Sequence, residues 1–417
     1  MKVLWLSKYV FRDAPDVGSG TWVGAIGRAL AQEAGIELYN IVCGEGLGEK
    51  ICHSDWRQVR QWLLPNWKIK RDGLPAKENI CELIGLIEGV DPDVVHIWGM
   101  ESYFGLLISR GWLKGRKCLL DVQGIRFAVG EYFAGNLTIG EQLRCVGLKE
   151  LACKASPMAL QAGLLNAKTR ELEMLRSFSN ISYQSEWVHD YLKMFVSQGT
   201  RLFKTRMALR DEFVEGEQKW TVRDRQNVVF ALGVGNRPYK GIHTLVRAIA
   251  YLKQCDVRYR NIQLQLGGEI GRRGWLKSGY LRKVEDEVVK YDLTDNVRFL
   301  GALTAGQIRD LLLRSAVFVQ PSFVESYSLA VAEAMAVGVP CVISNAGALP
   351  ELAEDGCSAL YFPSGDAVLC AERIRRILES DELSARLSEN ARNLAMARND
   401  SRRAVERQLE IYRRMVA

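Results

Sequence analysis

The chain repeats one order of segments: a short apolar run, a loop, and a longer stretch with apolar residues at helical spacing. In the first half the apolar runs are residues 2–7, 37–42, 94–98 and 118–122. Runs that are apolar throughout are typical of strands covered by helices on both faces. Their alternation with helices therefore predicts an α/β fold built on a parallel sheet.

The same order begins again after a charged stretch, residues 210–225, with further apolar runs at residues 227–232, 262–266, 297–300, 317–320 and 340–344. A chain of 417 residues is also too long for one ordinary core. We predict two domains, residues 1–222 and 223–395, and a final helix, residues 396–417, that packs back on the first domain. Open parallel sheets bind ligands beyond the carboxyl ends of their strands, so two facing sheets predict an interdomain cleft.

The composition of the chain limits the kinds of ligand and partner that it can be expected to bind. The net charge of +7 favours anionic ligands or an anionic membrane surface. The basic residues are spread along the chain without a nucleic-acid motif, so no nucleic acid is expected. The ten cysteines lie singly, and Asp91-Pro-Asp93 precedes its strand as a turn, so we expect reduced thiols and no metal. Because no apolar run could span a bilayer, we expect a cytoplasmic protein that can lie at the inner face of a membrane.

Residues 322–340 carry the strongest chemical signal. Glu325 lies in the loop after a predicted strand, and Ser328 stands where a helix N-cap is expected. The free amides at the start of such a helix, together with its dipole, form a binding site for a diphosphate. Glu333 lies about two turns further on, among small residues that indicate a buried helix, so its carboxylate needs polar partners. The alternative interpretation is that both carboxylates are merely solvated.

Two further loops follow predicted strands. Lys240 comes after residues 227–232, where its ammonium can offset the charge that develops on a departing diphosphate. Gly18, Ser19 and Gly20 follow the first strand and can approach the donor phosphates or the acceptor. A dinucleotide-binding fingerprint lacks support because Val23 replaces its third glycine, and a simple turn remains an alternative.

The first half offers fewer candidates. His96 lies late in its strand, as a core residue or on the acceptor side of the cleft, and Glu101 lies in the loop that follows. Residues 127–165 are apolar, helical in pattern and punctuated by Arg144, Lys149 and Lys154. This segment fits either the core of an acceptor-binding domain or a peripheral contact with a membrane that holds lipid-linked acceptors.

A set of motifs in the second half resembles the donor-binding region of the family 4 retaining glycosyltransferases: Glu325-x7-Glu333, the following Gly-Val-Pro, and residues 233–241, 296–301, 344–351 and 362–366. The resemblance covers nearly the whole second half, and the first half matches more loosely. It implies the GT-B architecture, in which two Rossmann-like domains face each other across a cleft. The first domain would bind the acceptor, the second a UDP- or GDP-sugar, without a cofactor and with retention of the anomeric configuration.

The resemblance also implies residue roles. Glu325 would contact the transferred sugar and Glu333 the ribose hydroxyls. The phosphates would be held by the main-chain amides of Ser326, Tyr327, Ser328 and Leu329. Family members commonly have Phe-Gly-Leu after the first glutamate, and Ser328 replaces that glycine, so its β-carbon can displace the amides slightly.

Other positions depart further from the family pattern. Val234 stands where an arginine is common, so we expect Arg237 or Asn236 to replace it. Many relatives carry a histidine after the next strand of the first domain, whereas residues 121–124 here read Asp-Val-Gln-Gly. Gln123 can donate a hydrogen bond but cannot transfer a proton, which leaves Glu101, Arg126 or the leaving phosphate for that step.

The sequence thus predicts a hexosyltransferase that acts on a glycan or lipid-linked acceptor, in surface polysaccharide biosynthesis. Its catalytic candidates are Lys240, Glu325 and Glu101, and its acceptor-side candidates are His96, Gln123 and Arg126. A sugar-nucleotide epimerase of the same fold and a non-catalytic sugar-nucleotide-binding protein are the alternatives.

Overall fold

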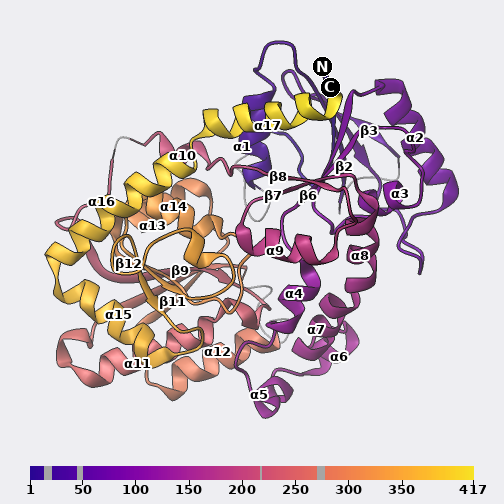
Figure 1. The fold of residues 1–417 in the computed structure, drawn as a ribbon. Coiled ribbons are helices and arrows are strands. Elements are labelled where there is room, and N and C mark those ends of the chain that lie inside the picture. The colour runs from indigo at the N-terminus through magenta and orange to yellow at the C-terminus, as the bar shows by residue number, and fades with distance from the viewer. Residues whose placement is uncertain (14–20, 45–49, 217, 270–277) are drawn as a thin grey trace.

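The computed structural model describes residues 1–13, 21–44, 50–216, 218–269 and 278–417. Within these residues the chain forms two α/β domains that lie against each other, each with a central sheet flanked by helices (Figure 1). The alternating sequence pattern predicts this architecture, and the prediction is confirmed.

The N-terminal sheet has the strand order β3-β4-β2-β1-β5-β6-β7-β8, in which β3 and β4 are antiparallel and the other neighbours are parallel. Its strands are β1 (Lys2–Ser7), β2 (Glu37–Cys43), β3 (Cys52–His53), β4 (Arg60–Leu64), β5 (Val94–Trp98), β6 (Cys118–Val122), β7 (Asn180–Tyr183) and β8 (Arg201–Lys204). Its helices are α1 (Thr21–Leu30), α2 (Lys77–Val90), α3 (Phe104–Ser109), α4 (Arg126–Glu131), α5 (Ile139–Arg144), α6 (Leu148–Ala152), α7 (Pro157–Asn166), α8 (Lys168–Ser177) and α9 (Glu186–Phe195).

The C-terminal sheet is parallel, in the order β11-β10-β9-β12-β13-β14. Its strands are β9 (Gln226–Val234), β10 (Gln263–Gly268), β11 (Val297–Gly301), β12 (Ser315–Gln320), β13 (Cys341–Ser344) and β14 (Leu360–Phe362). The helices from the linker onwards are α10 (Asp211–Val214), α11 (Ile242–Cys255), α12 (Gly279–Lys290), α13 (Ala305–Arg314), α14 (Leu329–Val337), α15 (Ala367–Glu379), α16 (Asp381–Arg398) and α17 (Ser401–Val416), with 3-10 turns η1 (Pro238–Lys240), η2 (Val257–Tyr259) and η4 (Leu349–Glu351).

Both sheets are buried on both faces. In β9, Val229 and Ala231 pack into one apolar cluster while Phe230 packs into a second cluster on the other face. In β1, Leu4 and Trp5 are divided in the same way. This explains why the strands read as continuous apolar runs, since every side chain along them meets a helix layer.

The charged stretch that links the two domains, residues 210–225, packs with the C-terminal domain. Leu209, Phe213 and Trp220 all pack into the cluster that covers one face of the second sheet. The C-terminal core therefore begins more than ten residues before the predicted boundary at residue 222.

The last helix, α17, leaves the C-terminal domain and lies on the N-terminal one (Figure 1). Ile411 and Tyr412 are fully buried there, and the Tyr412 hydroxyl accepts a hydrogen bond of 3.0 Å from the Trp5 indole. Residues at opposite ends of the chain thus share one core.

Polar contacts join the two domains across the cleft. The Ser185 hydroxyl, before α9, donates a 2.7 Å hydrogen bond to the Ser326 carbonyl. The Glu351 carboxylate accepts bonds of 2.7 and 2.8 Å from the amides of Glu186 and Trp187, which caps α9 from the other domain. The first bond holds the loop before α14 against the N-terminal domain, and the other two hold η4 there.

Candidate active site

Two loops at the carboxyl end of the C-terminal sheet form the centre of the site. The first follows β9 and contains η1, and the second joins β12 to α14. A β-carbon at Gly241, whose φ is 70°, would collide with the carbonyl oxygen of Pro321, so only glycine lets the loops approach this closely. The Phe323 amide also donates a 2.7 Å hydrogen bond to the Tyr239 carbonyl. The loops are thus fixed against each other.

This packing brings Lys240 and Glu325 together. The Lys240 ammonium lies 2.6 Å from Oε1 of Glu325, and both side chains are largely buried. The same oxygen accepts hydrogen bonds from the Ser322 hydroxyl at 2.7 Å and the Gln320 amide at 3.0 Å. Burial alone would lower the pKa of Lys240, but the Glu325 carboxylate raises it above its ordinary value. Lys240 is therefore a positive charge that Glu325 holds in place.

The start of α14 faces the other domain. Ser328 is its N-cap and has φ 85°, in the left-handed region that favours glycine, and its hydroxyl accepts a weak bond of 3.5 Å from the Val331 amide. A β-carbon at Gly124, after β6, would lie 3.0 Å from the Ser326 hydroxyl. The predicted phosphate-binding amides of Ser326, Tyr327, Ser328 and Leu329 therefore lie at the domain interface. The backbone here has the geometry that the glycine of the family pattern would adopt without strain.

Glu333 occupies a buried position in α14. Both of its oxygens accept 2.8 Å hydrogen bonds from the Arg210 guanidinium, and the two side chains are 5% and 8% exposed. Burial raises the pKa of Glu333, and Arg210 opposes that shift. The polar partner expected for this carboxylate is therefore Arg210. The sequence alone did not indicate it, because Arg210 lies in the charged stretch between the two domains.

The cleft itself contains a cavity of about 610 Å³ between the domains. Arg237 and Tyr239 line it from the C-terminal domain, and Glu101, Gly124 and Arg126 line it from the N-terminal domain. Of the two residues expected to replace the missing arginine, Arg237 lines this cavity. Asn236 also lines it, but its side-chain amide donates a 3.0 Å bond to the Ala155 carbonyl of the other domain.

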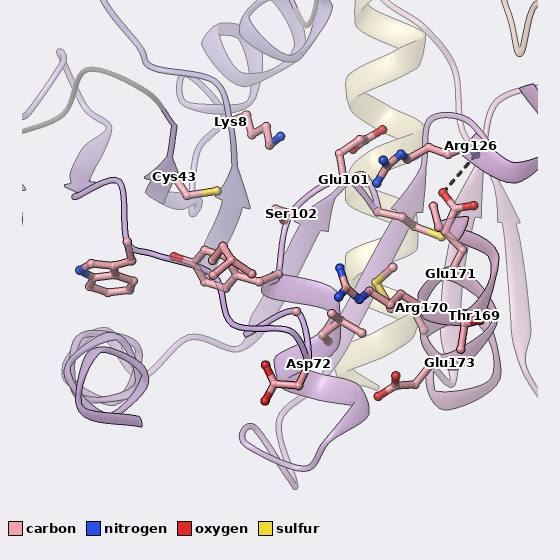
Figure 2. Close-up of a pocket in the computed structure, with 18 of the residues that line it drawn as sticks. Lys8, Cys43, Asp72, Glu101, Ser102, Arg126, Thr169, Arg170, Glu171 and Glu173 are labelled. Atoms are coloured by element: carbon pink, nitrogen blue, oxygen red, sulfur yellow. Dashed lines mark hydrogen bonds between the residues drawn. The ribbon is translucent and has the colours of Figure 1, made fainter. Parts of the chain in front are cut away.

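A second cavity of about 640 Å³ opens in the N-terminal domain and shares Glu101, Arg126 and Gly163 with the first. Figure 2 shows the side chains of Glu101 and Arg126 lying close to each other at its edge. Glu171 accepts hydrogen bonds of 3.1 Å from the amides of Arg126 and Phe127 at the start of α4. Burial raises the pKa of Glu171 to about 7, against the effect of these bonds. Glu101 and Arg126 thus lie where the two cavities meet.

His96 is not part of this site. It is fully buried, its Nδ1 lies 2.7 Å from the Tyr412 hydroxyl, and burial holds its pKa well below the ordinary value. The acceptor-side role predicted for His96 is therefore wrong, and the core interpretation is correct. The cause is α17, which covers the strand that carries this histidine.

Four further residues of the first domain were predicted to belong to the site, Gln123 and the loop residues Gly18, Ser19 and Gly20. Gln123 is half-buried and is not among the residues that line either cavity, whereas its neighbour Gly124 lines the first. Gly18, Ser19 and Gly20 lie outside the described residues. The described residues contain no cluster of three or more His, Cys, Asp or Glu side chains that could share a metal ion.

Two Rossmann-like domains that face each other across a cleft define the GT-B architecture. Sucrose-phosphate synthase from Thermosynechococcus elongatus has this fold and superposes with a TM-score of 0.73 at 20% identity over 99% of this chain and 98% of that one. The Anabaena protein Alr3699/HepE, whose structure contains UDP and glucose, gives 0.68 at 16% identity over 98% of each chain.

Residues 214–394 match the family described as "Glycosyl transferases group 1". Among curated relatives, a D-inositol 3-phosphate glycosyltransferase of Saccharomonospora viridis is 32% identical over 194 residues, 46% of this chain and 43% of that protein. An MMP alpha-(1->4)-mannosyltransferase of Mycolicibacterium hassiacum is 29% identical over 46% of this chain and 44% of its own length. The chain thus matches less than half the length of these relatives.

Proposed function

We propose that this protein is a retaining glycosyltransferase that moves a hexose-like unit from a UDP- or GDP-sugar to a glycan or lipid-linked acceptor in surface polysaccharide biosynthesis. The observation that carries the proposal is the 2.6 Å pair of Lys240 and Glu325 beside the start of α14. The cation and the helix amides together provide what a diphosphate requires. The family match of residues 214–394 supports the same reaction class.

In the proposed complex, the amides of residues 326–329 bind the diphosphate and Lys240 offsets the charge that grows on it as the sugar leaves. Because the pKa of Lys240 is raised, the ammonium stays charged at neutral pH. Glu325, fixed by Ser322 and Gln320, faces the sugar, and Glu333 is held by Arg210 for the ribose. Arg237 is a second cation for the phosphates.

The acceptor would enter between Glu101 and Arg126, where the two cavities meet. A front-face route, in which the leaving phosphate takes the proton of the acceptor hydroxyl, fits these residues without a dedicated base. Because all ten cysteines are free thiols, we place the reaction in a reducing compartment, the cytoplasm.

Thermal unfolding in the presence of UDP, GDP or ADP tests the donor site. A bound diphosphate should raise the melting temperature by mass action, and one nucleotide should do so most. Lys240→Ala and Glu333→Ala should each abolish the rise. Lys253→Ala is the matched control, because Lys253 pairs with the exposed Asp292 at the other end of α11 from Lys240. Full responses of both site variants would refute the proposed site.

Incubation of the protein with UDP- and GDP-sugars then separates the three functions. Transfer to an acceptor, or slow hydrolysis of the donor, supports the glycosyltransferase. Epimerisation of the donor, or tight binding without turnover, would instead identify one of the two alternatives.

A further inference from the structure

Helices α5 and α6 carry large aliphatic side chains on their outer faces. Ile139 and Leu143 on α5 are 75% and 56% exposed, and Leu148 and Leu151 on α6 are 86% and 66% exposed. We name these four residues the α5–α6 surface. Single exposed aliphatic residues are ordinary on a protein surface, but four on two successive short helices indicate a binding partner.

The acidic residues of the same two helices point the other way. Glu141 on α5 lies 2.8 Å from Arg247 and 3.3 Å from Lys283 of the C-terminal domain. Burial opposes ionisation of Glu141, but the Thr138 amide and Lys283 hold its pKa at about 2. The C-terminal domain thus neutralises this carboxylate and turns it away from the exposed leucines.

Glu150 on α6 repeats the arrangement. Its carboxylate lies 2.9 Å from the Arg282 guanidinium and accepts a 2.9 Å bond from the Gly279 amide, and the residue is almost fully buried. Both carboxylates are engaged in this way, while Arg144 and Lys154 are exposed. The charge presented beside the α5–α6 surface is therefore positive.

The α5–α6 surface also lies next to the cleft. Lys154, just after α6, lines the interdomain cavity together with Ala159 and Leu160 of α7. Figure 1 shows α5, α6 and α7 together at the lower end of the molecule, below α4. A molecule bound to the α5–α6 surface would therefore lie close to an entrance of the cavity.

We propose that the α5–α6 surface docks on an anionic lipid bilayer. Leu148 and Leu151 enter the boundary between headgroups and acyl chains, and Arg144 binds anionic headgroups. A second copy of the chain fits less well, because a symmetric contact would bring the same basic residues face to face. None of the helices in the described part of the chain has the length and apolar character of a membrane span.

This inference goes beyond the proposed transfer reaction, because lipid binding requires neither donor nor acceptor. It complements that reaction, since an acceptor anchored in the bilayer would meet the cavity at the membrane surface.

Flotation of the full chain with vesicles tests the surface. The protein should bind vesicles of phosphatidylcholine and phosphatidylglycerol, and bind less to phosphatidylcholine alone. Leu148→Glu combined with Leu151→Glu should lower the vesicle partition coefficient by about tenfold or more. Arg144→Gln should weaken binding to the anionic vesicles only. Val257→Glu is the matched control, because Val257 is 79% exposed on η2 of the C-terminal domain and should not affect binding.

Three outcomes would overturn the proposal: no binding to anionic vesicles, unchanged binding of the double variant, or an equal loss in the control. Self-association that the double variant abolishes, without vesicle binding, would show a contact between copies instead. Melting temperatures and their rise with nucleotide must stay unchanged in every variant. Because vesicle binding is measured without donor, its loss would leave the proposed function intact, and a failed transfer assay would leave the membrane proposal intact.

Discussion

The two sides of the cleft differ in how their polar groups are held. On the C-terminal side, Lys240 with Glu325 and Arg210 with Glu333 form close, largely buried pairs. On the N-terminal side, Glu101 is exposed and Arg126 half-buried, at the edges of two large cavities. The difference agrees with the proposed function, in which a rigid and compact site binds the diphosphate that many donors share. In the same proposal the more exposed side chains of the N-terminal side bind the acceptor, which is one particular molecule.

Of the changes that test this comparison, removal of the Arg210 side chain should have the largest effect. Arg210→Ala leaves the Glu333 charge buried without its partner, and we expect a loss of about 3–5 kcal/mol in the free energy of unfolding. Urea denaturation measures it. Arg258→Ala is the control, because Arg258 is 62% exposed in its ion pairs and its removal should change the free energy of unfolding far less. Equal losses would mean that the Arg210 pair is no more than a surface interaction.

Lys240→Ala should lower the rate of transfer by about 10²–10³-fold, because the charge on the leaving diphosphate loses its fixed cation. Steady-state kcat/KM for the donor measures this effect. Lys240→Arg should recover part of the rate. A variant with full kcat/KM would place the catalytic cation elsewhere.

Asp121 gives the N-terminal domain a pH dependence. Burial raises its pKa to about 7, although Ser182 and Gln184 donate hydrogen bonds to it. The folded state therefore binds this proton more tightly than the unfolded state does. The contribution of Asp121 to the free energy of unfolding is greatest below about pH 4 and is lost as the pH rises to about 7. We expect Asp121→Asn to remove about 2–4 kcal/mol of this fall in urea denaturation across about pH 4–8. Asp91→Asn, at a 73% exposed side chain, should leave it in place.

Arg126→Ala tests whether the N-terminal side of the cleft acts on the acceptor and not on the nucleotide. Its guanidinium lines both cavities, so we expect the KM for the acceptor to rise about tenfold or more, since a charged contact is lost. The rise in melting temperature with nucleotide should not change. A loss of nucleotide binding would assign Arg126 to the donor instead.

Ser328→Gly is expected to have the smallest effect. A serine is strained at φ 85°, whereas a glycine is not. The substitution also removes the hydrogen bond that the Ser328 hydroxyl accepts from the Val331 amide, but at 3.5 Å this bond is weak. The free energy of unfolding should rise by about 1 kcal/mol, measured by thermal or urea unfolding. A destabilised variant would show that the cap outweighs the strain.

The strands, and the loops that carry Lys240 and Glu325, could be predicted because their signals are local. Buried strands are apolar throughout, and Lys240 and Glu325 follow such strands directly. Arg210 and Glu333 are 123 residues apart, so no local pattern joins them. The position of His96 depends on Tyr412, 316 residues further along the chain, which no property of its own strand indicates. Contacts made by the tertiary fold alone were thus the ones that the sequence could not show.

The contact between β1 and α17 has a consequence for biosynthesis. Trp5 is translated 407 residues before Tyr412, whose hydroxyl accepts the hydrogen bond of its indole. Until residues 401–416 have been translated, one layer of the N-terminal core has no cover, and the nascent domain exposes aromatic surface that chaperones bind.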